Sequence, residues 1–120
     1  MENRYLFRGK TISGNWVHGL LANKDDKWYI SNKAGAPFAY EIRPESICQC
    51  TGLRDKNDAL IWENDIVKIN NSKMNTVITF RDFEIICTIP NEKYYKHRLE
   101  YDTEYEVIGN IFDNPELLEV

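Results

Sequence analysis

Residues 93–98 form a basic cluster whose members alternate with aromatic side chains. Aromatic rings can stack on nucleobases while lysine and arginine pair with phosphates, so this composition is typical of single-stranded nucleic-acid binding. Acidic residues flank the cluster at Glu92, Glu100 and Asp102, which favours a charged loop between two strands. We therefore treat this nucleic-acid or partner surface as an alternative to the main prediction. Its residues are Lys93, Tyr94, Tyr95, Lys96, His97 and Arg98.

Three acidic residues, Asp102, Glu104 and Glu106, follow at every second position. Successive side chains of a β-strand point to opposite faces, so on a strand these carboxylates would share one face. Such a row could bind a divalent cation, and hence serve a metal-dependent enzyme, or bind a basic partner. An acidic row is more often the solvated face of an edge strand, where charge discourages aggregation. We predict a solvated acidic surface and keep the metal site as an alternative.

Cysteine and histidine occur in patterns that do not match the usual catalytic or zinc-binding arrangements. Cys48 and Cys50 are two residues apart, which is poor spacing for joint zinc ligation, and no second pair lies near them. Cys87 makes the number of cysteines odd. His18 and His97 are the only histidines, and no motif of a serine hydrolase, P-loop protein or zinc protease is present. We expect free thiols, no cofactor, no metal and no catalytic activity.

Composition and charge narrow the class of protein further. The chain has 120 residues, of which 42% are hydrophobic and 12% aromatic, as in a globular domain rich in β-structure. Its formal net charge of -4 and sequence pI of about 5.2 argue against general nucleic-acid binding, which usually requires a basic excess. No apolar run approaches the length of a membrane span, and the first residues lack the layout of a signal peptide. We expect a cytoplasmic protein that does not enter a membrane.

The elements that position these residues are predicted to be short strands separated by polar turns. Gly14-Asn15 indicates a hairpin, a bend is expected near Arg81-Asp82, and Gly109-Asn110 indicates a bulge. Residues 44–46 suit a single helical turn, and a short helix should follow Asn114, with Pro115 in its first position. The predicted strands are residues 4–8, 16–21, 28–31, 38–42, 47–53, 59–63, 65–69, two within 76–89, and 104–112.

The segment TGLRDKNDALIWENDIVKI, residues 51–69, places acids and an aromatic between two predicted strands. An aromatic with two acids could hold a cation at residues 62–65. The simpler interpretation is a tight turn at Asn64-Asp65 in which the Asp65 carboxylate accepts backbone N–H groups. Residues 55–58 likewise suit a turn, because a calcium loop would need more oxygen ligands at regular spacing.

This segment, with YEVIGNIFDNPELL at 105–118 and with FRGK and WVHGLL near the start, resembles the YopX family of phage and prophage proteins. Asp58 and Asn64 stand where the family usually has glycine, and both residue types tolerate left-handed backbone. We interpret the matching motif residues as structural. They are Thr51, Gly52, Leu53, Asp55, Trp62, Glu63, Asp65, Gly109, Asn110 and Pro115.

The strand pattern predicts one mainly β domain over residues 1–120, with a seam near residue 53 and a short C-terminal helix. The resemblance implies that an N-terminal β-meander or pseudo-barrel (1–53) precedes an SH3-like barrel half (54–120). It also implies a phage-encoded protein of uncharacterised activity. We predict a non-catalytic binding module that acts as a homo-oligomer in the bacterial cytoplasm and has a host or phage protein as a possible partner.

Overall fold

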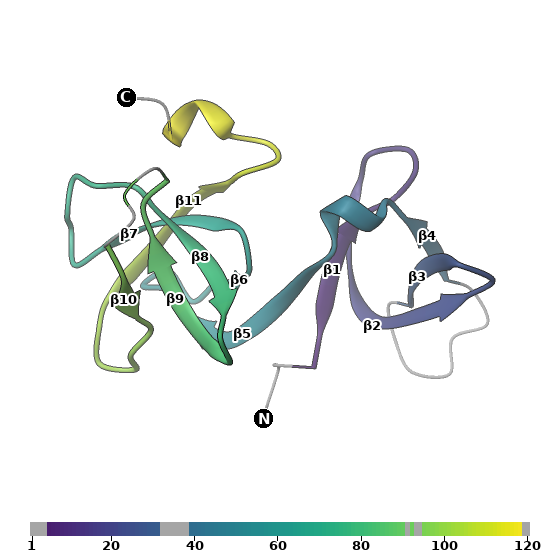
Figure 1. Cartoon of the computed structure of the whole chain (residues 1–120), viewed down its shortest axis with the longest axis horizontal. Coiled ribbons are helices and arrows are strands. Elements are labelled where there is room, and N and C mark those ends of the chain that lie inside the picture. Colours follow the sequence, from purple (N-terminus) through teal and green to yellow (C-terminus); the bar gives the residue numbers. More distant parts are fainter. Residues whose placement is uncertain (1–4, 32–38, 91, 93–94, 119–120) are drawn as a thin grey trace. The chain divides into compact units, whose positions relative to one another are not determined.

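A computed structural model describes residues 5–31, 39–90, 92 and 95–118 of the chain. The protein is mainly β, as the sequence predicts, and all of its strand pairs are antiparallel (Figure 1). The chain divides into two compact units, Met1–Cys50 and Thr51–Val120. This division lies three residues before the seam expected at residue 53.

The N-terminal unit is a sheet with the strand order β4-β3-β2-β1-β5. Its members follow one another as a meander until β5 returns to pair with β1, where Arg8 lies opposite Cys48. The single helical turn predicted at residues 44–46 is the 3-10 helix η1. The bounds are β1 Phe7–Lys10, β2 Trp16–Lys24, β3 Lys27–Ser31, β4 Tyr40–Ile42, η1 Pro44–Ser46 and β5 Cys48–Arg54.

Two turns of this unit follow from their residue types. Gly14 has φ 96° in the turn that joins β1 to β2, where the sequence predicts a hairpin. Asp25 and Asp26 have φ 54° and 64° between the paired residues Lys24 and Lys27. Two successive left-handed residues define the type I′ hairpin turn, which asparagine, aspartate and glycine favour.

The N-terminal core depends on a close approach at Gly9. A Cβ atom added to Gly9 would overlap Cγ2 of Ile42, so only glycine fits there without movement. Ile30 and Ile42 are fully buried beside it. The Ser46 hydroxyl accepts a hydrogen bond from Lys10 N at 2.7 Å and donates one to Arg43 O at 2.7 Å, so this buried polar side chain is neutral and satisfied.

The C-terminal unit contains a five-stranded sheet with the order β10-β9-β8-β7-β11, and β6 pairs with β5. Its bounds are β6 Leu60–Trp62, β7 Asp65–Ile69, β8 Thr76–Arg81, β9 Glu84–Thr88, β10 His97–Arg98 and β11 Tyr105–Asn110. The central core cluster of buried side chains consists of Ile61, Val67, Ile78, Cys87 and Tyr105.

The expectation for the barrel needs correction. Within the described residues the strand order of each sheet is open, so neither sheet closes into a barrel. The C-terminal segment forms a single 3-10 helix, η2 Pro115–Leu118, where the sequence predicts a short helix. The Oδ1 of the preceding Asn114 accepts a hydrogen bond from Asn110 N at 3.2 Å.

The predicted bulge is present in β11. Its pairing with β7 shifts between Val107 and Gly109, and a Cβ atom on Gly109 would lie 2.6 Å from Asn114 Oδ1. The bend between β8 and β9 lies one residue later than predicted, at Asp82-Phe83, because Arg81 pairs with Glu84. Across the described parts of the chain, neither helix has the length and apolar character needed to cross a membrane.

Candidate functional site

The buried carboxylate of Asp55 connects two distant parts of the C-terminal unit. Its Oδ1 accepts hydrogen bonds from Asn57 N and Ala59 N, and its Oδ2 accepts one from Val107 N, all at 2.9 Å. Backbone groups of Lys56 and Tyr105 join the same two segments at 2.8 Å. Asp55 therefore binds backbone within the protein, and both of its carboxylate oxygens are used.

The turn at Asn64-Asp65 is held in a similar way. Asp65 is 2% exposed, and its Oδ2 accepts a hydrogen bond from Trp62 N at 2.8 Å. Asn64 has φ 70°, donates its N–H to Ile78 O at 2.8 Å and accepts from Ile111 N at 3.1 Å. The hydrogen bond to Asp65 is the interaction that the tight-turn interpretation predicts. It uses a carboxylate oxygen that a cation site would need as a ligand.

A third polar centre lies at Asn110 in β11. Its side-chain Oδ1 accepts hydrogen bonds from Phe112 N at 3.0 Å and Asp113 N at 2.9 Å, while its Nδ2 donates to Asp113 Oδ2 at 3.3 Å. The amide thereby fixes the chain as it leaves β11 toward η2. Asp55, Asp65 and Asn110 share one role. Each accepts hydrogen bonds from backbone N–H groups that have no partner in a neighbouring strand.

Four residues of the basic cluster 93–98 lie in the described part of the chain, and Lys93 and Tyr94 lie outside it. The four described residues do not form one surface. Lys96 Nζ and Arg98 Nε pair with the two carboxylate oxygens of Glu84 at 3.3 and 2.9 Å. Hydrogen bonds from Arg98, and secondarily from Lys96, lower the pKa of Glu84 below its usual value. Both cations are thus already paired with an anion of their own unit.

The aromatic members of the cluster are separated from these cations. His97 Nε2 lies 3.1 Å from the Tyr105 hydroxyl, which also accepts a hydrogen bond from Glu100 N at 3.0 Å. Because Glu100 N–H donates to the hydroxyl oxygen, the hydroxyl hydrogen can be donated to His97 Nε2. Tyr95 instead lines a pocket, and burial raises its pKa.

Only Glu106 of the acidic row lies in a strand, so the three carboxylates do not share one strand face. Asp102 lies in a turn and Glu104 precedes β11, whereas Glu106 is in the strand and pairs with Lys56 at 3.7 Å. Pairing with β7 starts only at Tyr105, since Asn70 Oδ1 accepts Glu104 N and breaks the expected strand. No group of three or more histidine, cysteine, aspartate or glutamate residues suited to a metal occurs among the residues described.

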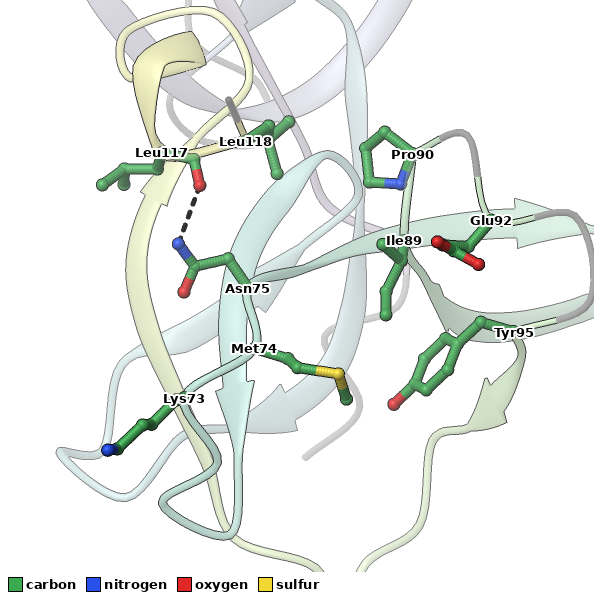
Figure 2. A pocket seen from close by; sticks show the side chains of 9 residues that line it. All are labelled: Lys73, Met74, Asn75, Ile89, Pro90, Glu92, Tyr95, Leu117 and Leu118. Atoms are coloured by element: carbon green, nitrogen blue, oxygen red, sulfur yellow. Dashed lines mark hydrogen bonds between the residues drawn. The ribbon is translucent and has the colours of Figure 1, made fainter. Parts of the chain in front are cut away.

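The remaining candidate is a pocket of about 540 Å³ within the C-terminal unit (Figure 2). Figure 2 shows the side chains of Met74, Ile89 and Tyr95 converging from the segments before β8, after β9 and before β10. Three polar side chains, of Lys73, Asn75 and Glu92, complete a mostly apolar lining. The other lining residues are Pro90, Leu117 and Leu118.

The side-chain amide of Asn75 has one buried atom without a hydrogen-bond partner among the described residues. Its Nδ2 donates a hydrogen bond to Leu117 O at 2.7 Å, whereas its buried Oδ1 has no hydrogen-bond partner among the described residues. A buried acceptor without a partner costs about 1–3 kcal/mol, and most such groups in proteins are satisfied. This oxygen has almost no accessible surface, so a ligand in the pocket could bond to it only if the Asn75 side chain moved.

Sequence reasoning identified only Tyr95 among the pocket residues. The others come from the segments 73–75, 89–92 and 117–118, which are far apart in sequence and have no shared motif. Only the pairing of β8 with β9 and the hydrogen bond from Asn75 to Leu117 bring them together. No signal in the sequence alone could have indicated this pocket.

Comparison with known proteins bears on the whole chain. No curated protein matched it. The family model described as YopX protein matches residues 8–119, which includes both structural motifs and all the pocket-lining segments. The Asp55 to Val107 hydrogen bond and the Asn64 to Ile111 contact show how the two motifs meet in the fold. Because this match spans almost the entire sequence, the chain belongs to the YopX family.

Proposed function

We propose that this chain is a non-catalytic binding module whose ligand site is the pocket of the C-terminal unit. The observation that carries the proposal is a cavity of about 540 Å³ that combines apolar walls with the polar side chains of Lys73, Asn75 and Glu92. Ligand sites are typically concave and mostly apolar, with a few polar groups that fix orientation. The pocket has this composition.

The ligand class that fits best is a protein segment presenting one large apolar side chain. Burying an aromatic side chain removes about 150–250 Å² from water, which corresponds to roughly 4–6 kcal/mol before the costs of association. Lys73 and Glu92 would supply weaker, salt-sensitive contacts at the rim.

The biological setting proposed here rests on the resemblance to phage and prophage proteins. It comprises a phage-encoded protein in the bacterial cytoplasm, acting as a homo-oligomer or on a host or phage protein. An SH3-like C-terminal half would suit this role, because such folds commonly serve as interaction scaffolds. Nucleic-acid binding by residues 93–98 and metal-dependent catalysis by residues 102–106 receive less support, given the Glu84 ion pairs and the turn at Asp102.

The proposal is tested by titrating N-acetyl-phenylalaninamide into the protein while recording NMR spectra. We expect saturable shifts of the Asn75 side-chain amide, the Met74 methyl group and the Tyr95 ring. Met74 is 47% exposed, so Met74→Glu should fold normally while placing a charge in the pocket and weakening binding. Shifts that do not saturate, or that are equal in this variant, would remove the pocket as the ligand site.

A further inference from the structure

Phe83, in the turn between β8 and β9, has two unusual properties. Its side chain is fully exposed, at 110% relative exposure, and its backbone is left-handed, with φ 66°. The other non-glycine residues with positive φ in the described chain are all asparagine or aspartate: Asp25, Asp26, Asp58, Asn64, Asn70, Asn71 and Asp82. A bulky residue at such a φ is an outlier, and strained residues of this kind concentrate at functional sites.

Neither the turn nor the core accounts for phenylalanine at this position. A two-residue hairpin turn is most stable with glycine or asparagine, and a fully exposed aromatic ring gains nothing from burial within its own chain. The ring can gain free energy only by entering an apolar site on another molecule. Phe83 therefore has the properties of an anchor residue, since large aromatic side chains dominate binding energy at protein interfaces.

The pocket and Phe83 lie at opposite ends of the same hairpin. Met74 and Asn75 come immediately before β8, and Ile89 and Pro90 immediately after β9, whereas Phe83 is in the turn that joins the two strands. A strand rises about 3.3 Å per residue, so the six residues of β8 span about 20 Å. Phe83 consequently cannot reach the pocket of its own chain.

The charges beside Phe83 complement those at the rim of the pocket. Arg81 and Asp82 are exposed next to Phe83, and Lys73 and Glu92 are exposed at the rim. None of these four side chains makes an ion pair within the described residues. Pairing Arg81 with Glu92 and Asp82 with Lys73 would place opposite charges together around the inserted ring.

We propose that the pocket receives Phe83 from a second copy of this chain. This inference rests on the proposed function, for which it names the partner. Because turn and pocket occupy opposite ends of one hairpin, two antiparallel hairpins can each insert their Phe83 into the other's pocket. Such an exchange is reciprocal and closes around a twofold axis, so a dimer is the smallest complete assembly.

The test uses sedimentation equilibrium on the full chain and on Phe83→Asn. Asparagine tolerates left-handed backbone, so this variant should fold at least as well as the original, which thermal unfolding will verify. We expect the original chain to self-associate and the variant to have a dissociation constant at least about 30-fold higher, as for loss of an interface hot spot. An unchanged dissociation constant, or a monomeric original chain at millimolar concentration, would overturn the inference.

Mixing two defective variants tests the contact itself. Met74→Glu keeps the anchor and disables the pocket, while Phe83→Asn keeps the pocket and removes the anchor. Each should be monomeric alone, and the mixture should form one-to-one pairs through the one contact left intact. Adding Phe83→Asn to the Met74→Glu chain must abolish this pairing, and pairing that persists in that control would contradict the proposed contact.

The probe titration separates failure of this inference from failure of the proposed function. In Phe83→Asn the pocket has no competing anchor, so N-acetyl-phenylalaninamide should bind more tightly than to the original chain. Equal binding to both, with self-association insensitive to Phe83, would leave the pocket as a ligand site and remove the second copy as its partner. Absence of binding to either protein would remove both proposals.

Discussion

Among the described residues that are buried as a whole, the polar side chains of the N-terminal unit are neutral, whereas two of those in the C-terminal unit are carboxylates. Ser46 satisfies one backbone donor and one acceptor beside the close approach at Gly9. Asp55 and Asp65 instead accept hydrogen bonds from backbone N–H groups in turns, where no neighbouring strand supplies a carbonyl acceptor. The C-terminal unit should therefore be sensitive to loss of a charge, and the N-terminal unit to added volume.

The largest expected effect is that of Asp55→Ala on the C-terminal unit. Three backbone N–H groups lose their acceptor, and hydrogen bonds to charged groups are among the strongest, so the free energy of unfolding should fall by about 3–5 kcal/mol. Chemical denaturation measures this. Asp58→Asn is the matched control in the same turn, since Asp58 is exposed and asparagine tolerates its φ of 67°, and it should change stability by less than about 0.5 kcal/mol.

Gly9→Ala tests the N-terminal half of the comparison. The added methyl group overlaps Ile42, so overpacking should cost about 2 kcal/mol. Combining Gly9→Ala with Ile42→Ala removes the overlapping Cγ2 atom. The double variant should then lose less stability than the sum of the two single changes, as measured by denaturant unfolding. Strict additivity would show that the close approach is relieved in another way.

Alkaline pH should weaken the C-terminal unit through Cys87. Burial raises the pKa of this thiol from 9.0 to about 11, so between these values the unfolded chain releases a proton that the folded chain retains. The contribution of the protonated Cys87 thiol to the free energy of unfolding is therefore complete below pH 9 and is lost as the pH rises toward 11. The free energy of unfolding should fall by about 1 kcal/mol between pH 8 and 10.

Unfolding curves of the original chain and Cys87→Ala, recorded across this range, measure the effect. The variant should show a smaller decrease, although burial also raises the pKa of Tyr105 and leaves part of the dependence in place. Identical pH profiles would contradict the role assigned to Cys87.

The smallest effect concerns the exposed ion pairs of Glu84. Arg98→Ala should raise the pKa of Glu84 toward its ordinary value more than Lys96→Ala does, because the hydrogen bond from Arg98 is the larger cause of the lowered pKa. Carboxyl-carbon NMR titration measures both shifts. Little change in thermal stability is expected from either substitution, since exposed ion pairs contribute weakly to folding. The reverse order of shifts would show that Lys96 dominates the pairing.

Local chemistry explains which parts of the fold could be predicted. The β-branched run at 76–88, the aspartates at 25–26 and the glycine of the β11 bulge each carry their structural signal in adjacent residues. The three acids do not share one strand face, because Asn70, distant in sequence, binds Glu104 N and the strand begins only at Tyr105. The pocket was missed for the same reason, since its walls meet only after β8 and β9 pair.

The strand β5 contributes to both units. Its first half pairs with β1 of the N-terminal unit, and it also pairs with β6 of the C-terminal unit. Before the boundary between the units, the even-numbered residues Cys48 and Cys50 are buried. After it, the odd-numbered residues Thr51 and Leu53 face the core of the C-terminal unit, and the Thr51 hydroxyl donates a hydrogen bond to Ile61 O in β6. Inserting one residue at the start of β5 would exchange inward and outward positions along it, whereas inserting two would restore them. An error of register at the start of β5 would therefore expose Cys48 and Cys50, which are fully buried in the native strand.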